Sequence, residues 1–147
     1  MSPAQTGQII SVIMEKNMTF KAIITGAAAL VLSSTFAIAD HHSAKAIKQA
    51  DTSAGTVLTN AAGLTLYTFD KDADGVSNCY DQCATNWPPM PAEASSKNEG
   101  DFSVVKRKDG TFMWAYKGEP LYTWIGDSAK GDVTGDGVGG VWHIAKP

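Results

Sequence analysis

Short runs of β-branched, aromatic and aliphatic residues, separated by Gly- and Asn-rich turns, follow one another from Val57 to Ile144. They predict a hairpin whose strands, residues 57–59 and 64–69, flank a turn at residues 60–63. A three-strand meander is predicted at residues 102–105, 111–116 and 121–124, and residues 141–144 read as a closing strand. No long segment has the apolar spacing of a helix, although residues 79–86 have room for one helical turn.

The chain repeats itself at an offset of 55 residues, the separation of Tyr67 from Tyr122, and the two copies align without a gap. Such self-similarity predicts two tandem units, and we place them at about residues 55–92 and 102–147, in one domain of residues 55–147. The duplicated motif positions are Tyr67 and Tyr122, Phe69 and Trp124, Asp72 and Asp127, and Trp87 and Trp142.

We therefore expect an all-β fold, a small sandwich or barrel built from two tandem hairpin or meander repeats. An isolated hairpin is marginal in water, whereas two facing hairpins bury apolar area at about 25 cal/mol per Å². Because side chains alternate along a strand, Tyr67 and Phe69 face one way and Leu66 the other. We interpret the duplicated aromatic residues as core, in preference to a ligand cage.

The first 39 residues have the three parts of a cleaved signal helix, with residues 1–17 a candidate over-long start. Lys16 and Lys21 precede an apolar run, and a small-residue cleavage signal ends at Ala39. Cleavage leaves 108 of the 147 residues, enough for one small domain. Residues 40–54 are polar and lack an apolar period, and we expect them to form a flexible tail.

The mature chain would be mildly acidic, and its basic residues do not cluster beyond Lys106–Arg107–Lys108, which we interpret as the flank of a turn. Nucleic acid is therefore not an expected partner, and membrane insertion after signal cleavage is not expected either. The chain has no nucleophile elbow, zinc-protease motif or phosphate-binding loop. We expect a non-enzymatic protein that binds a partner or a small ligand.

Cys79 and Cys83 are the only cysteines. In an oxidising compartment we expect them to pair, and a turn rather than a regular helix to hold them. A thiol–disulfide role remains open, as does a Cu(I) site in which Met90 or His143 supplies a third ligand.

Metal handling is the rival function, and two stretches suggest it. The first begins like a calcium loop with EF-hand spacing, its ligands being Asp70, Asp72, Asp74, Asn78 and Asp81. Solvated Asx-turn loops are the alternative interpretation, here and in the Gly-rich loop of the second repeat. The second is the tail, where cleavage after Ala39 would present Asp40, His41 and His42 with a free amine, a nitrogen set suited to Cu(II) or Ni(II). Solvated tail histidines are the alternative there.

The duplicated motif resembles the Yx(F/W/Y)xxD motif of a bacterial family of secreted repeats and predicted lipoproteins. Its two copies begin at Tyr67 and Tyr122, and residues 78–89, with two cysteines before Trp87-Pro88-Pro89, are similar to another motif of that family. The resemblance covers about residues 55–147 and implies a cell-envelope protein without assigning an activity. Many members carry a lipidated cysteine at the cleavage site. Here no cysteine precedes Cys79, which indicates a soluble periplasmic or secreted protein.

A hydrogen-bonded latch between the repeats would involve four of the motif residues, Tyr67, Asp72, Tyr122 and Asp127.

Overall fold

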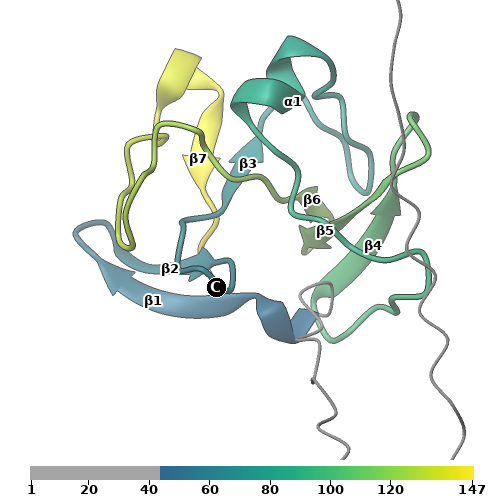
Figure 1. The fold of residues 1–147 in the computed structure, drawn as a ribbon, viewed down its shortest axis with the longest axis horizontal. Helices are drawn as coiled ribbons and strands as arrows, with labels where there is room; N and C mark the ends of the chain where they lie inside the picture. Colours follow the sequence, from purple (N-terminus) through teal and green to yellow (C-terminus); the bar gives the residue numbers. More distant parts are fainter. Residues whose placement is uncertain (1–43) are drawn as a thin grey trace, which may run out of the picture. The chain divides into compact units, whose positions relative to one another are not determined.

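The computed structural model describes residues 44–147 and consists mostly of short strands (Figure 1). The predicted signal peptide at residues 1–39 lies outside the described residues, so its helix and cleavage remain predictions. The elements in chain order are η1 (Ala44–Ala46), β1 (Lys48–Thr52), β2 (Gly55–Thr59), β3 (Tyr67–Phe69), α1 (Gln82–Asn86), β4 (Phe102–Lys106), β5 (Phe112–Tyr116), β6 (Glu119–Pro120), η2 (Val138–Gly140) and β7 (Trp142–Ile144).

The strands form three small antiparallel sheets, which confirms the prediction of an all-β fold built from two tandem repeats. β1 pairs with β2, and β3 pairs with β7. β4–β5–β6 form a meander whose first two strands match the prediction, while its third, β6, comes before the predicted strand at residues 121–124. Figure 1 shows β3 beside β7, with β4 on the opposite side of the fold. In the part of the chain that the structure describes, no helix is long and apolar enough to span a membrane.

Each repeat ends in a segment that pairs with the other repeat. β3 of the first repeat pairs with β7 of the second, with Tyr67 opposite Ile144. At the same offset in the opposite direction, Tyr122 of the second repeat bridges to Pro89 of the first. Between them Tyr67 and Tyr122 exchange backbone hydrogen bonds of 2.8 and 2.9 Å. The repeats are therefore related by a pseudo-twofold axis at the two tyrosines, and each completes the other.

The sequence alone suggested that the two copies align without a gap, but in the structure they do not. Leu58 N–H donates to Ala145 at 2.9 Å, whereas Trp114 N–H donates to Met90 at 2.9 Å. Leu58 therefore corresponds to Trp114, one position beyond the offset that relates Tyr67 to Tyr122. The first repeat has one more residue in its hairpin turn, which restores the original offset.

The predicted strand at residues 64–69 is shorter in the structure. A Thr59–Thr65 bridge and a 2.8 Å hydrogen bond from Leu66 N–H to Leu58 continue the hairpin, and β3 then leaves it for β7. The predicted strand at residues 121–124 contains only the bridges of Tyr122 to Tyr67 and Pro89. Each of these segments forms backbone pairs with two different neighbouring segments, so its regular pairing with either one is short.

The prediction of a flexible tail through residue 54 is wrong for its described part. η1 contributes buried Ala44 and Ala46, Ile47 is also buried, and β1 pairs with β2 along its whole length. β1 lacks an apolar period because its side chains are exposed or half-buried, and the β2 backbone holds it. This strand could have been recognised from the repeat, because β1 corresponds to β4, where the sequence analysis predicted a strand.

The core has two parts, as the alternation predicted. One contains the duplicated aromatic residues, including Tyr67, Trp87, Tyr122 and Trp142. The other contains aliphatic residues and Trp114, and Ala44 and Ala46 of η1 belong to it together with Leu58, Leu66, Met90 and Leu121.

Candidate functional site

Four aromatic rings form one continuous column through the middle of the fold. The ring centroids of Phe69 and Trp142 lie 4.2 Å apart, those of Trp142 and Trp87 3.8 Å, and those of Trp87 and Trp124 4.2 Å. The rings come alternately from the first and second repeats. The two inner indoles are 4% exposed, whereas Phe69 and Trp124 at the ends are partly exposed. The four motif aromatics of this column are thus core residues, and the two at its ends reach the surface.

Two tyrosines meet the column with their ring edges. The Tyr67 ring lies 5.4 Å from Trp87 at 78°, and the Tyr122 ring lies 5.2 Å from Trp142 at 88°. Edge-to-face contacts of this kind are a favoured aromatic geometry.

Both phenols donate to a carboxylate of the opposite repeat, which forms the latch suggested by the sequence. Tyr67 Oη donates to Asp127 Oδ2 at 2.6 Å, and Tyr122 Oη donates to Asp72 Oδ2 at 2.7 Å. Burial is the main cause that raises the pKa of both phenols, with the hydrogen bond to the carboxylate adding to it for each. Each phenol therefore keeps its proton at neutral pH.

The two latches differ in their surroundings. Asp127 is 6% exposed, and its Oδ1 accepts the backbone N–H and the hydroxyl of Thr134 at 3.0 and 2.7 Å. Asp72 is half-buried, and its Oδ1 accepts Asn78 N–H at 2.7 Å. Burial raises the pKa of Asp72, while the bonds from Tyr122 and Asn78 oppose that shift.

Arg107 completes the second latch, a role that the sequence analysis missed. The side chain is buried, and it donates to Ser77 Oγ at 2.6 Å and to the Cys79 carbonyl at 2.8 Å. Ser77 Oγ lies 2.7 Å from Tyr122 Oη. Because a guanidinium only donates and a carboxylate only accepts, the chain runs in one direction, from Arg107 through Ser77 and Tyr122 to Asp72.

Arg107 lies at the flank of a turn, as predicted, since it follows β4 and its carbonyl accepts the Gly110 N–H at 3.0 Å, but its side chain is buried. Its guanidinium lies 4.4 Å from the Tyr80 ring centroid, and it holds the disulfide loop of the first repeat against the second. The copy of this position in the first repeat is Thr52, so the repeat pattern gave no warning of the arginine's role.

Replacing Arg107 by Met is expected to lower the free energy of unfolding by about 2–3 kcal/mol, because the Ser77 and Cys79 oxygens lose their buried donors. Denaturant unfolding measures the change. Lys108→Met, one residue along and exposed, is the control, with an effect expected within about 0.5 kcal/mol. Equal effects of the two substitutions would contradict the anchoring role.

The Asp72 latch predicts a distinct dependence of stability on pH. Because burial raises the pKa of Asp72 above 3.8, the folded state binds this proton more tightly than the unfolded state. Its contribution is complete at pH below 3.8 and is lost as the pH rises through the folded-state value. Asp72→Asn should remove that component while the amide oxygen still accepts from Tyr122.

Unfolding of the wild type and Asp72→Asn over an acidic pH series measures this difference. Asp109, which is exposed, and Asp132, which is partly buried, have pKa values lowered chiefly by bonds from Thr111 and from the Ala129 backbone, respectively. Their stabilisation is therefore lost at pH below 3.8 instead. A difference curve that is flat above pH 3.8 would refute the assignment to Asp72.

The predicted calcium ligands do not converge. Asp70 Oδ2 lies 2.9 Å from His143 Nε2. The Asp72 carboxylate accepts hydrogen bonds from Asn78 N–H and Tyr122 Oη. The side-chain amide of Asn78 donates to the Lys71 carbonyl at 2.8 Å. Among residues 44–147 no three His, Cys, Asp or Glu side chains form a group that would hold a metal ion. Loops closed by their own side chains, the alternative interpretation, fit these hydrogen bonds.

Cys79 and Cys83 form a disulfide, with their sulfurs 2.03 Å apart. Cys79 precedes α1 and Cys83 lies within it, and between them Asp81 has a φ of 51°, which turns the chain as expected. Neither sulfur is a free thiol, so in this state the pair does not provide a Cu(I) site. Met90 is buried in the aliphatic core and His143 pairs with Asp70. Asp40, His41 and His42 lie outside the described residues.

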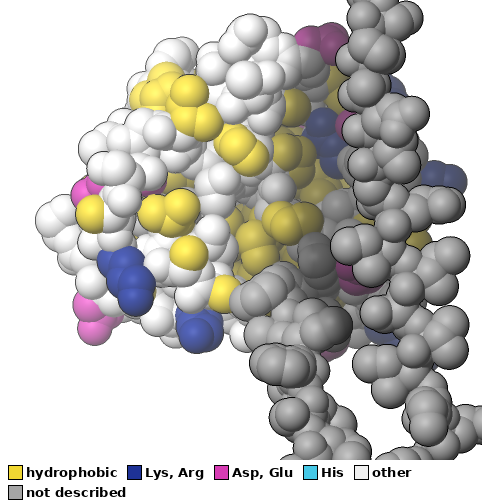
Figure 2. Space-filling view, in the orientation of Figure 1, with side chains coloured by type: hydrophobic (Ala, Val, Ile, Leu, Met, Phe, Trp, Pro, Cys, Tyr) yellow, Lys and Arg dark blue, Asp and Glu magenta, His cyan; other side chains and the backbone are white. Residues whose placement is uncertain are grey.

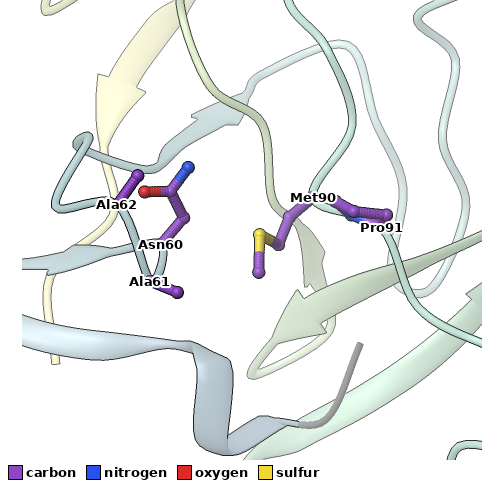
Figure 3. A pocket seen from close by; sticks show the side chains of 5 residues that line it. All are labelled: Asn60, Ala61, Ala62, Met90 and Pro91. Atoms are coloured by element: carbon purple, nitrogen blue, oxygen red, sulfur yellow. The ribbon is translucent and has the colours of Figure 1, made fainter. Parts of the chain in front are cut away.

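Two pockets open on the surface of this domain. An apolar one of about 350 Å³ lies between the turn at Asn60, Ala61 and Ala62 and the segment Met90–Pro91. Figure 3 shows Met90 pointing across it toward the turn, and Figure 2 shows hydrophobic side chains gathered near the centre of this face.

The second pocket, of about 380 Å³, is polar and lies where the repeats meet. The first repeat supplies the motif residues Phe69 and Asp72, and the second supplies its hairpin turn. The full lining is Phe69, Asp70, Asp72, Ala73, Asp74, Lys117, Gly118, Glu119 and Pro120. A Cβ at Gly118 would overlap the Asp74 carboxylate, and φ is +86° there, so only glycine fits this wall without strain.

These features define an all-β domain of two tandem repeats that exchange their closing segments around a shared aromatic column. The chain belongs to the family described as a secreted repeat of unknown function, whose model matches residues 48–90 and 103–146. The first match begins at β1, in agreement with its place in the repeat. No curated protein and no solved structure showed significant similarity to the chain.

Proposed function

We propose that this secreted repeat protein is a non-enzymatic binding protein of the cell envelope, periplasmic or released, that holds a positively charged group of a partner or small ligand in the polar pocket. The pocket at the junction of the repeats carries the proposal. It is lined by four carboxylates, those of Asp70, Asp72, Asp74 and Glu119, against one amine, that of Lys117.

Two of these carboxylates are already engaged, Asp70 with His143 and Asp72 with Tyr122. Asp74 and Glu119 are exposed and have no side-chain partner among residues 44–147. The Phe69 ring adds an apolar wall to the same pocket. An ammonium or guanidinium group on a short apolar stem would match this combination of charge and ring.

The described residues offer little support for catalysis. His143 is the one histidine among residues 44–147. It is exposed and hydrogen-bonds to Asp70, and no hydroxyl or thiol of these residues donates to it. A base without a nucleophile or a polarised substrate site does not assemble a hydrolytic centre. Binding therefore accounts for the arrangement better than turnover does.

Titration of the isotope-labelled domain with a tetralysine peptide at low ionic strength tests the proposal. We expect saturable NMR shifts at Asp74 and Gly118 that weaken on addition of salt. The double substitution Asp74→Asn/Glu119→Gln should abolish them. Asp51→Asn/Glu99→Gln removes the same charge from β1 and the inter-repeat segment, and should leave them intact. Equal loss in both double variants would reduce the binding to non-specific attraction and overturn the proposal.

A further inference from the structure

The aromatic column connects the surface to two buried phenols, each already bonded to a proton acceptor. Trp124 is partly exposed at one end and stacks on Trp87, which stacks on Trp142. Tyr67 and Tyr122 are fully buried and meet the two inner indoles edge on. No other part of residues 44–147 brings rings together in so continuous a series.

The chemistry of these side chains gives the series a direction. Indole and phenol lose one electron far more readily than benzene, so Trp124, and not Phe69, is the end at which an oxidant would act. Rings in van der Waals contact exchange an electron vacancy rapidly. An oxidised phenol is a strong acid and keeps the vacancy only when its proton has somewhere to go.

We propose that the column is a one-electron relay in which an oxidising equivalent enters at Trp124, passes through Trp87 and Trp142, and is trapped as a neutral tyrosyl radical at Tyr67 or Tyr122. The co-reactant is a one-electron oxidant too large to enter the core. It takes one electron from Trp124 and is reduced by one. The electron that refills the column comes from the phenol, whose O–H bond breaks as its proton moves to the bonded carboxylate.

The charges balance at each latch. A neutral phenol beside an ionised Asp127 becomes a neutral tyrosyl radical beside a neutral carboxyl group, so the pair loses one negative charge as one electron leaves. The proton crosses a single hydrogen bond, 2.6 Å at Tyr67–Asp127 and 2.7 Å at Tyr122–Asp72. Burial favours the neutral product, because an ionised carboxylate is costly to bury.

The purely structural alternative is a packed core in which the rings only contribute buried area. It explains the stacking, and the latch between the repeats explains the bonds from the two phenols to the carboxylates. The two interpretations differ in one measurable result, which is where a radical appears when the intact protein meets an oxidant that touches only its surface.

The chain has four tyrosines, and Tyr80 and Tyr116 are partly exposed. The test therefore starts from the variant Tyr80→Phe/Tyr116→Phe, in which any tyrosyl signal must come from Tyr67 or Tyr122. A photogenerated ruthenium(III) tris-bipyridine complex serves as the oxidant. Transient absorption and freeze-quench EPR follow the radical, with circular dichroism as the check on folding.

In that background we expect an indole radical that converts to a tyrosyl radical. Trp124→Leu should remove the tyrosyl signal, because the oxidant then has no indole at the surface end. Asp127→Asn/Asp72→Asn keeps an acceptor oxygen at each phenol but no base, so the indole radical should persist and the tyrosyl signal be lost. Absence of a tyrosyl signal in the background, or an undiminished signal in folded Trp124→Leu, would overturn the relay.

Discussion

Separated into residues 44–92 and 102–147, neither half of the domain is expected to fold, and mixing the halves is expected to restore the fold. β3 has its pairing partner, β7, in the other half, and Tyr122 has Pro89 there. Each half alone would expose its Trp and Tyr rings and leave these backbone groups without their partners. Circular dichroism and NMR of each half and of the mixture measure this.

The restored complex should unfold at a midpoint that rises with protein concentration, because its folding includes association. The intact domain, residues 44–147, is the control and should unfold at a concentration-independent midpoint. Cooperative unfolding of either half by itself would show that the repeats are independent and would contradict the exchange of closing segments as the source of stability.

Truncation of Trp87 to Ala is expected to cost about 3–5 kcal/mol of unfolding free energy, the range for a buried large aromatic. Trp87 lies between Trp142 and Trp124 at centroid distances of 3.8 and 4.2 Å, and it receives the edge of Tyr67. The substitution therefore opens a cavity at the centre of the column and breaks contact between its two ends.

Trp124→Ala is the matched control, because Trp124 has the same side chain at the partly exposed end and stacks only on Trp87. Its cost should be clearly smaller. Ile125→Ala, at a residue 59% exposed, should change stability by no more than about 0.5 kcal/mol. Chemical denaturation of the three variants ranks them, and a larger loss for Trp124→Ala than for Trp87→Ala would refute the column as the centre of the core.

Much of the fold could be predicted from local pattern. Duplication of Tyr67 and Tyr122, alternation along the strands and the short spacing of Cys79 and Cys83 follow from residue types at fixed separations, and the structure contains each. β1 was missed because an edge strand with exposed side chains has no apolar alternation. The gapless alignment failed because two one-residue differences compensate each other. The turn between β4 and β5 has one residue more than that between β1 and β2, and the first repeat has one residue more in its following hairpin turn, so the duplicated positions on either side stay in phase.

From the order of its residues alone, the folded domain can be recognised as a duplicated β unit with its motif aromatics inside, because repetition and side-chain alternation are properties of the sequence. Three features follow only from the three-dimensional fold: the pairing of β3 with β7, the burial of Arg107 under the disulfide loop, and the separation of the carboxylates of residues 70–81. A strand's backbone donors and acceptors carry no information about their partner. A guanidinium or carboxylate becomes buried or exposed only when segments distant in the chain meet around it.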